Sequence, residues 1–135
     1  MKISSTYAIF KTNSKGGFMK IEVHEKSHGI KIIRPHGKIV SGPKVMKLKK
    51  IINDLIDEGE KEIILDFDKV PFMDSTGLGV LIAAYTSLQK EKGEMKLVHV
   101  DKRIKDLLTI TKLLSLFDCY DSEADAVKAM LNNNG

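Results

Sequence analysis

The residues best placed to do chemistry form the run Asp74-Ser75-Thr76-Gly77-Leu78-Gly79. A carboxylate beside a hydroxyl is half of a triad-like nucleophilic site. Serine before a helix is also a common cap, and a serine hydroxyl can carry a phosphate. A helix N-terminus favours a negative group, because its first backbone N–H groups converge there without partners. The run is therefore compatible with a nucleophile, an anion-binding loop or a serine that a partner protein recognises.

Two elements must position this run. The apolar residues Ile63–Phe67 come before it and predict a buried strand. Apolar residues at spacings of three and four follow it and predict a helix that begins at Leu78 and ends near Lys92-Gly93. The run is thus a strand-to-helix elbow that should present Ser75 at a helix N-terminus.

The rest of the chain alternates between the two patterns. Strands are expected near residues 19–24, 30–34, 61–67, 95–98 and 117–120, with 37–40 either a third short strand or a continuation. Helices are expected at about 43–58, from 101, and from 121 or 122 to about 131. This order predicts one α/β domain with a parallel or mixed sheet. Residues 1–18 are expected to be a flexible arm before a domain at 19–132. Met19 is an alternative start, because Met19-Lys20-Ile21 repeats the opening Met1-Lys2-Ile3.

Composition limits the classes of function. Residues 1–50 hold 12 lysines and arginines against two acids, a net charge of +10, and residues 51–135 hold 10 against 16, a net charge of −6. Such a basic half can indicate nucleic acid or an anionic membrane, but without interleaved aromatic residues solvated lysines are the better interpretation. No apolar run reaches the roughly 20 residues of a bilayer span, and the single Cys119 fits a reducing compartment. We therefore expect a cytoplasmic protein with no nucleic-acid or membrane partner.

Metal and nucleotide sites are poorly supported. The four histidines, His24, His28, His36 and His99, share no helical pairing, so we expect no metal site and read them as surface or edge residues. Asp66, Asp68 and Asp74 could suggest an acidic Mg²⁺ cluster, but a solvated strand end is the more usual meaning. Gly77-Leu78-Gly79 lacks the rest of a nucleotide-binding motif, so no cofactor is expected. Gly77 is instead expected to let the chain enter the helix, and Gly79 to let the helix approach the sheet closely.

Catalysis by Ser75 is also poorly supported, because the residue two positions before it is Met73 and not the glycine of a nucleophile elbow. A catalytic pair of Ser75 and His99 is kept as a minor alternative. A recognised serine fits better: a phosphate would add about −1.5 to −2 charges at an interface. A loss of about 3 kcal/mol there would weaken a complex roughly a hundredfold. The residues alone leave this switch and a simple helix cap equally open.

The stretches Ile63-Ile64-Leu65-Asp66-Phe67 and Phe72-Met73-Asp74-Ser75-Thr76-Gly77-Leu78-Gly79 strongly resemble the signature of STAS domains, specifically bacterial anti-sigma factor antagonists. The resemblance covers roughly residues 19–131. It implies a mixed sheet of four or five strands flanked by about four helices. A departure lies at Val40, where many such antagonists have an acidic residue, so the resemblance does not extend to conventional kinase contacts at this position.

The resemblance also implies a function. The unphosphorylated antagonist would bind an anti-sigma factor that is also a serine kinase, phosphorylation of Ser75 would break the complex, and a phosphatase would restore it. The chain would then be a substrate and not an enzyme. The implied partner-binding residues are Asp74, Ser75, Thr76, Gly77 and Leu78. The alternative is a STAS module without a switch, acting as an accessory subunit of a lipid transporter or as a signalling scaffold.

Overall fold

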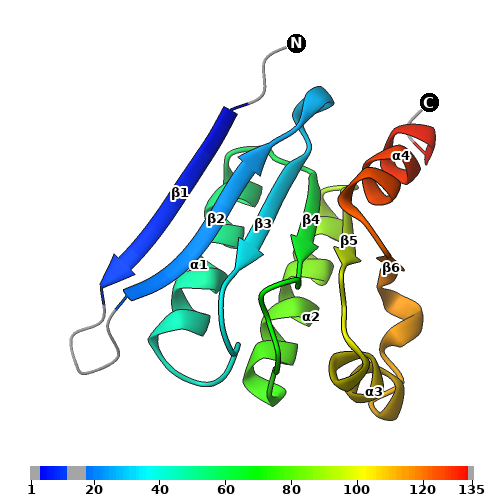
Figure 1. Cartoon of the computed structure of the whole chain (residues 1–135). Helices are drawn as coiled ribbons and strands as arrows, with labels where there is room; N and C mark the ends of the chain where they lie inside the picture. Colours follow the sequence, from blue (N-terminus) through cyan, green and yellow to red (C-terminus); the bar gives the residue numbers. More distant parts are fainter. Residues whose placement is uncertain (1–3, 12–17, 134–135) are drawn as a thin grey trace.

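Figure 1 shows the computed structural model of the chain, which describes residues 4–11 and 18–133. The described strands are β1 (Ser4–Lys11), β2 (Phe18–Glu25), β3 (Lys31–Pro35), β4 (Glu62–Asp66), β5 (Glu94–Val98) and β6 (Asp118–Tyr120). The described helices are α1 (Pro43–Asp57), α2 (Ser75–Lys90), α3 (Lys102–Ile110) and α4 (Glu123–Asn133), with the short 3-10 turns η1 (Ser27–Gly29) and η2 (Leu114–Leu116).

The strands form a single sheet in the order β1-β2-β3-β4-β5-β6. The first two pairings, β1 with β2 and β2 with β3, are antiparallel, and the remaining three are parallel. Each parallel pair is joined through helix, as connections between parallel strands require. The expected α/β class, with a mixed sheet flanked by about four helices, is confirmed.

Both faces of the central strands are apolar, because alternate residues of a strand point to opposite sides. Ile63 and Leu65 of β4 pack into the larger core with residues of α1, α2 and α3. Ile64, between them, packs into a smaller core with Ala126 and Met130 of α4. Helices α1 and α2 therefore cover one face and α4 covers the other (Figure 1). Burial on both faces explains why Ile63, Ile64 and Leu65 are consecutive apolar residues in the sequence.

Strand β1 differs from the sequence expectation. Residues 1–18 were predicted to be a flexible arm, yet the structure pairs Ser4–Lys11 with Phe18–Glu25 along the whole length of both strands. The sheet therefore has six described strands, of which β2 to β6 are the five expected within the domain. Backbone hydrogen bonding to β2 supplies the order that the side-chain pattern alone did not predict. The rest of the predicted arm, residues 1–3 and 12–17, lies outside the described residues.

Residues 37–40 do not form the expected third strand or a continuation of β3. Within them only Ile39 pairs, in an isolated parallel bridge with Met73. Helix α2 also begins at Ser75 and not at Leu78, because Asp74 caps it three residues earlier than the apolar spacing indicated. Both differences bring the segment before α1 against the start of α2, which is where the candidate site lies.

Candidate functional site

Asp74 fixes the start of α2. Its backbone is extended, with φ −99° and ψ −172°, and its Oδ1 accepts the Gly77 backbone N–H at 3.0 Å, as in an N-cap. Its Oδ2 accepts the Ser41 backbone N–H at 3.0 Å. These two hydrogen bonds hold the pKa of Asp74 below its usual value, and the bond from Ser41 has the larger effect. A carboxylate engaged in this way is a weak base, so Asp74 serves as a structural clamp and not as a partner in proton transfer.

The segment before α1 is joined to the elbow by backbone bonds as well. The Ile39 N–H donates to the Phe72 carbonyl at 3.0 Å, and the Asp74 N–H donates to the Ile39 carbonyl at 3.2 Å. Together with the Ser41 bond to Asp74, these contacts hold the two segments together at three points. The elbow is therefore supported from both sides and presents its outer residues on a fixed frame.

The predicted site residues divide into two groups. Ser75 and Thr76 are exposed and Asp74 is half-buried, so these three lie at the surface. Gly77 and Leu78 are buried, and Leu78 belongs to the larger core. The structure thus presents the Ser75 hydroxyl at the first residue of α2, where the helix favours an added anion.

The two glycines have different roles from those expected. A Cβ on Gly77 would lie 2.6 Å from the Ile39 carbonyl oxygen and 2.6 Å from the Met73 Cγ. Gly77 is therefore the residue that permits close approach. Gly79 was predicted to bring the helix onto the sheet, which is wrong: it is exposed, and an added Cβ would meet nothing within 4 Å.

Two clefts flank the exposed serine. The first, here called the α1–α2 cleft, has a volume of about 180 Å³, and Met46, Lys49, Thr76, Gly79 and Ala83 are among its lining residues. The second, here called the α3 cleft, has a volume of about 330 Å³ and is lined by residues that include Phe72, Arg103 and Ile110. Met46 in the first cleft is 62% exposed, and Phe72 and Ile110 in the second are 42% and 78% exposed, so both clefts offer apolar side chains to a partner.

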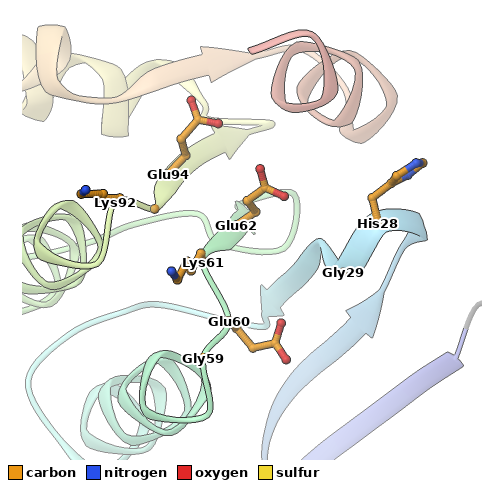
Figure 2. Close-up of a pocket in the computed structure, with 9 residues that line it drawn as sticks. His28, Gly29, Gly59, Glu60, Lys61, Glu62, Lys92 and Glu94 are labelled. Carbon is orange, nitrogen blue, oxygen red and sulfur yellow. The ribbon is translucent and has the colours of Figure 1, made fainter. Parts of the chain in front are cut away.

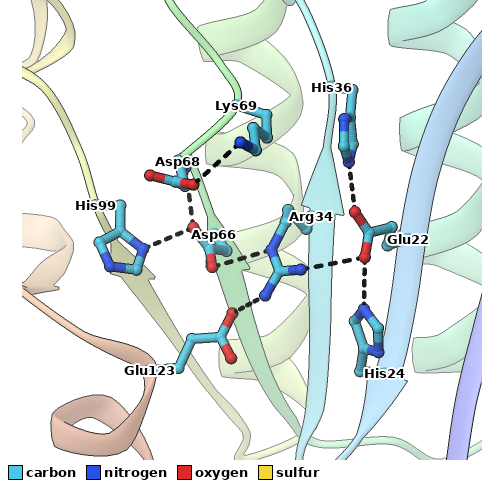
Figure 3. A network of polar contacts seen from close by, with 9 residues as sticks. All are labelled: Glu22, His24, Arg34, His36, Asp66, Asp68, Lys69, His99 and Glu123. Atoms are coloured by element: carbon cyan, nitrogen blue, oxygen red, sulfur yellow. Dashed lines mark hydrogen bonds and ion pairs between the residues drawn. The ribbon is translucent and has the colours of Figure 1, made fainter.

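A network of charged side chains lies at the ends of the strands (Figure 3). Arg34 of β3 donates to Glu22 of β2 at 3.1 Å, to Asp66 of β4 at 3.2 Å and to Glu123 of α4 at 2.5 Å. One guanidinium therefore links three elements. Burial raises the pKa of Asp66, but the hydrogen bonds that it accepts, from the carboxyl group of Glu123 first and from His99 second, hold that pKa below its usual value.

The histidines of this network were expected to be surface or edge residues. His24 and His36 both contact Glu22, at 2.8 Å for His24, and His99 Nδ1 lies 2.9 Å from Asp66 Oδ1. Asp66, expected at a solvated strand end, is only 1% exposed, so that expectation is wrong. Its burial is possible because Arg34 and His99 supply compensating charge and hydrogen bonds.

The network bears on the alternative chemistries. His99 is engaged by Asp66, and among the described residues no hydrogen bond joins it to Ser75. Within residues 4–11 and 18–133 no group of three or more histidine, cysteine, aspartate or glutamate side chains could hold a metal ion. Over the same part of the chain, no helix combines the length and apolar character that crossing a bilayer requires.

A larger cavity of about 410 Å³ is shown in Figure 2. It lies where β4 and β5 begin, whereas the elbow follows the end of β4. Residues just before and at the start of β4 and β5 line it, including Glu60, Lys61, Glu62, Lys92 and Glu94. Burial and then the carboxylate of Glu94 raise the pKa of Glu62. The lining mixes both signs of charge, which makes it a less defined site than the elbow and its clefts.

Sequence reasoning did not identify the network or the clefts. A signal for the network was present, because Arg34 and Asp66 directly follow the apolar residues of two strands, Ile32-Ile33 and Ile63-Ile64-Leu65. Charges that interrupt neighbouring buried strands are expected to pair. The clefts had no comparable signal, since they depend on how α1, α2 and α3 pack around the elbow.

Comparison with known proteins gives consistent results. The profile of the family described as STAS domain matches residues 21–126. The Anti-sigma F factor antagonist of Paenibacillus polymyxa is 28% identical over 111 residues, which are 81% of this chain and 94% of the relative.

Solved structures show the same fold. The Bacillus cell fate determinant SpoIIAA in its phosphorylated form superposes with a TM-score of 0.67 at 20% identity, covering 82% of this chain and 98% of that chain. A sulfate transporter family protein from Wolinella succinogenes superposes with a TM-score of 0.68 at 25% identity, covering 80% of this chain and 90% of that chain.

Proposed function

This chain belongs to the STAS-domain family, and on that premise we propose that it is an anti-sigma factor antagonist whose binding is controlled at Ser75. Its partner is an anti-sigma factor that is also a serine kinase. The unphosphorylated form binds that partner and releases the sigma factor, and a phosphatase regenerates it after phosphorylation. The protein acts in the cytoplasm on sigma-factor-dependent transcription, and it is a substrate and binding partner rather than an enzyme.

The observation that carries this proposal is the position of Ser75. Its side chain is exposed at the first turn of α2, between two clefts with exposed apolar residues. The Ser75 hydroxyl is therefore available to a kinase, and a partner that covers both clefts also covers it. That a structural relative has been solved in a phosphorylated form supports the same chemistry here.

The switch follows from charge. In the kinase complex the Ser75 Oγ attacks the γ-phosphorus of ATP, its proton passes to the kinase, and ADP leaves. The product carries about −1.5 to −2 charges beside Asp74. The start of α2 tolerates that anion, since its N-terminal N–H groups favour negative charge. A partner that had covered the serine would instead have to bury the dianion, which breaks the complex.

The test is to incubate the protein with ATP and each purified anti-sigma factor kinase of the same organism, and to map the phosphate by mass spectrometry. We expect modification at Ser75, and none in Ser75→Ala, which should still bind. Ser75→Asp should lose binding. Ser115→Ala, at an exposed serine of η2 that lines neither cleft, is the matched control that retains both properties. Equal affinity of Ser75→Asp and Ser75→Ala for the kinase would refute the switch.

The likeness to a sulfate transporter family protein supports a second candidate. In that role the chain is a STAS module without a switch, working as an accessory subunit of a lipid transporter or as a signalling scaffold. Salt-sensitive binding to anionic liposomes, together with no phosphorylation of Ser75 by any of the kinases, would favour it over the antagonist.

A further inference from the structure

The α1–α2 cleft has walls suited to an apolar side chain. On the α2 side Gly79 and Ala83 are small and exposed, and a Cβ on Gly79 would meet open space. On the α1 side Met46 is 62% exposed. Methionine is flexible and polarisable, so it adapts to different apolar contacts. An incoming side chain can therefore pack between Met46 and the small residues of α2.

The same cleft has a cation at its edge. Lys49 is exposed and lines the cleft, and no acidic group among the described residues lies within ion-pair distance of it. Lys50 differs, because its Nζ lies 3.1 Å from Asp54 Oδ2. Lys44 is also engaged, since its Nζ donates to the His36 carbonyl. Lys49 is thus the lysine of α1 best placed to meet a charge brought by another molecule.

The surroundings reinforce this positive charge. The first half of α1 carries Lys44, Lys47, Lys49 and Lys50, and the first acid of the helix is Asp54. The unpaired N–H groups at the start of α1 add a partial positive charge. Charged groups that meet across an interface are arranged to be complementary. The matching group on a partner is therefore a carboxylate next to an apolar side chain.

We propose that the α1–α2 cleft selects the partner protein by taking an acidic and apolar segment, with a carboxylate against Lys49 and an apolar side chain against Met46, Gly79 and Ala83. This inference rests on the proposed function and adds the chemistry of the partner to it. It also strengthens the switch, because Thr76 lines the cleft directly beside Ser75. A phosphate on Ser75 would repel the partner's carboxylate and compete with it for Lys49.

The experiment compares neighbouring lysines of one helix. Affinity for the anti-sigma factor kinase that binds the wild type is measured at low and high salt for Lys49→Glu and, as matched control, Lys50→Glu. We expect Lys49→Glu to weaken binding by about tenfold or more at low salt, with a smaller difference at high salt. Lys50→Glu should stay within about twofold, because its charge pairs within α1. Met46→Ala should also weaken binding, with little dependence on salt. Circular dichroism confirms that each variant is folded.

The outcomes separate this inference from the proposed function. If Lys49→Glu and Met46→Ala bind like the wild type while Ser75→Asp does not, the cleft does not select the partner, yet the switch stands. If no such kinase binds the wild type, the proposed function fails. The cleft is then tested by NMR with two short peptides, one of glutamate and leucine and one of lysine and leucine.

Shifts at Met46, Lys49 and Gly79 with the acidic peptide alone would support the cleft as a site for acidic, apolar segments. Shifts elsewhere, or none, would overturn it. Vesicles of phosphatidylglycerol serve as the competing probe. Retention on them that Lys49→Glu and Lys50→Glu reduce equally would assign the lysines to a membrane surface and would also overturn the inference.

Discussion

At the scale of single residues, the elbow depends on which of its glycines faces the protein. Gly77 is in contact with the backbone of Ile39, and Gly79 opens onto the α1–α2 cleft. Both residues are glycines of the first turns of α2, and they differ only in the side of the helix on which they lie. That side follows from the cap at Asp74, which starts the helix at Ser75.

The two glycines give a matched pair of substitutions. Gly77→Ala places a methyl group 2.6 Å from the Ile39 carbonyl oxygen, a backbone atom that cannot move aside cheaply. We expect it to lower the free energy of unfolding by about 1–3 kcal/mol. Gly79→Ala, in open space on the same helix, should raise it by up to about 1 kcal/mol. Urea denaturation of both variants measures the difference, and equal midpoints would contradict the structure.

His99 gives a prediction about pH. The hydrogen bond to Asp66 raises the pKa of His99 in the folded protein. The pair therefore makes its full contribution to stability when the pH is below the pKa of an unfolded histidine, about 6.5. That contribution disappears as pH rises through the folded pKa. His99→Asn suits the positive backbone φ of 56° and removes the charge.

His99→Asn should therefore lower the free energy of unfolding by up to about 1 kcal/mol at about pH 6, and by less at about pH 9. The effect is small because the histidine is partly exposed. Urea denaturation at the two pH values measures the cost. A cost that stays constant between them would show that the imidazolium does not contribute.

At the scale of elements, Arg34 holds β2, β4 and α4 together. Although burial opposes its charge, Glu123 and Asp66 raise the pKa of Arg34, so it stays charged. Arg34→Leu would leave the carboxylates of Glu22 and Asp66 buried without their cation. We expect the substitution to lower the free energy of unfolding by about 3–5 kcal/mol near neutral pH.

That loss should shrink in acid, because protonation neutralises the carboxylates. Lys31→Leu is the control. Lys31 pairs with the partly exposed Glu25, so we expect this substitution to lower the free energy of unfolding by only about 1 kcal/mol or less. Thermal unfolding followed by circular dichroism at two pH values compares the variants. A loss for Arg34→Leu no larger than that for Lys31→Leu would show that the network does not hold the elements together.

The sequence predicted most elements because their signals are local. Alternation and spacings of three and four placed β2 to β6 and the four helices. The pairing of β1, the burial of Asp66 and the side of α2 on which Gly79 lies each depend on residues distant in the chain. Arg34, for example, is 32 positions from Asp66. Ser75 was identified from its local motif, whereas the clefts beside it are made by three helices packed together.

At the scale of the whole molecule, phosphorylation of Ser75 should change charge without changing the fold. The serine is exposed, and Asp74, not Ser75, makes the capping bonds to Ser41 and Gly77. NMR spectra of the phosphorylated protein should differ from those of the unmodified protein only near residues 39–41 and 72–79 and at Lys49 across the α1–α2 cleft. Shifts spread across β2 or α4 would show instead that the modification acts through a conformational change.

The order of the sheet has a consequence for synthesis. Each strand pairs with the strand made just before it, from β1 at one edge to β6 at the other. Among the described strands, none has to be inserted between two that are already paired, so each pairing closes one comparatively short loop. As the chain leaves the ribosome from its N-terminus, every new strand finds its neighbour already made. The sheet can therefore grow in one direction, in step with translation.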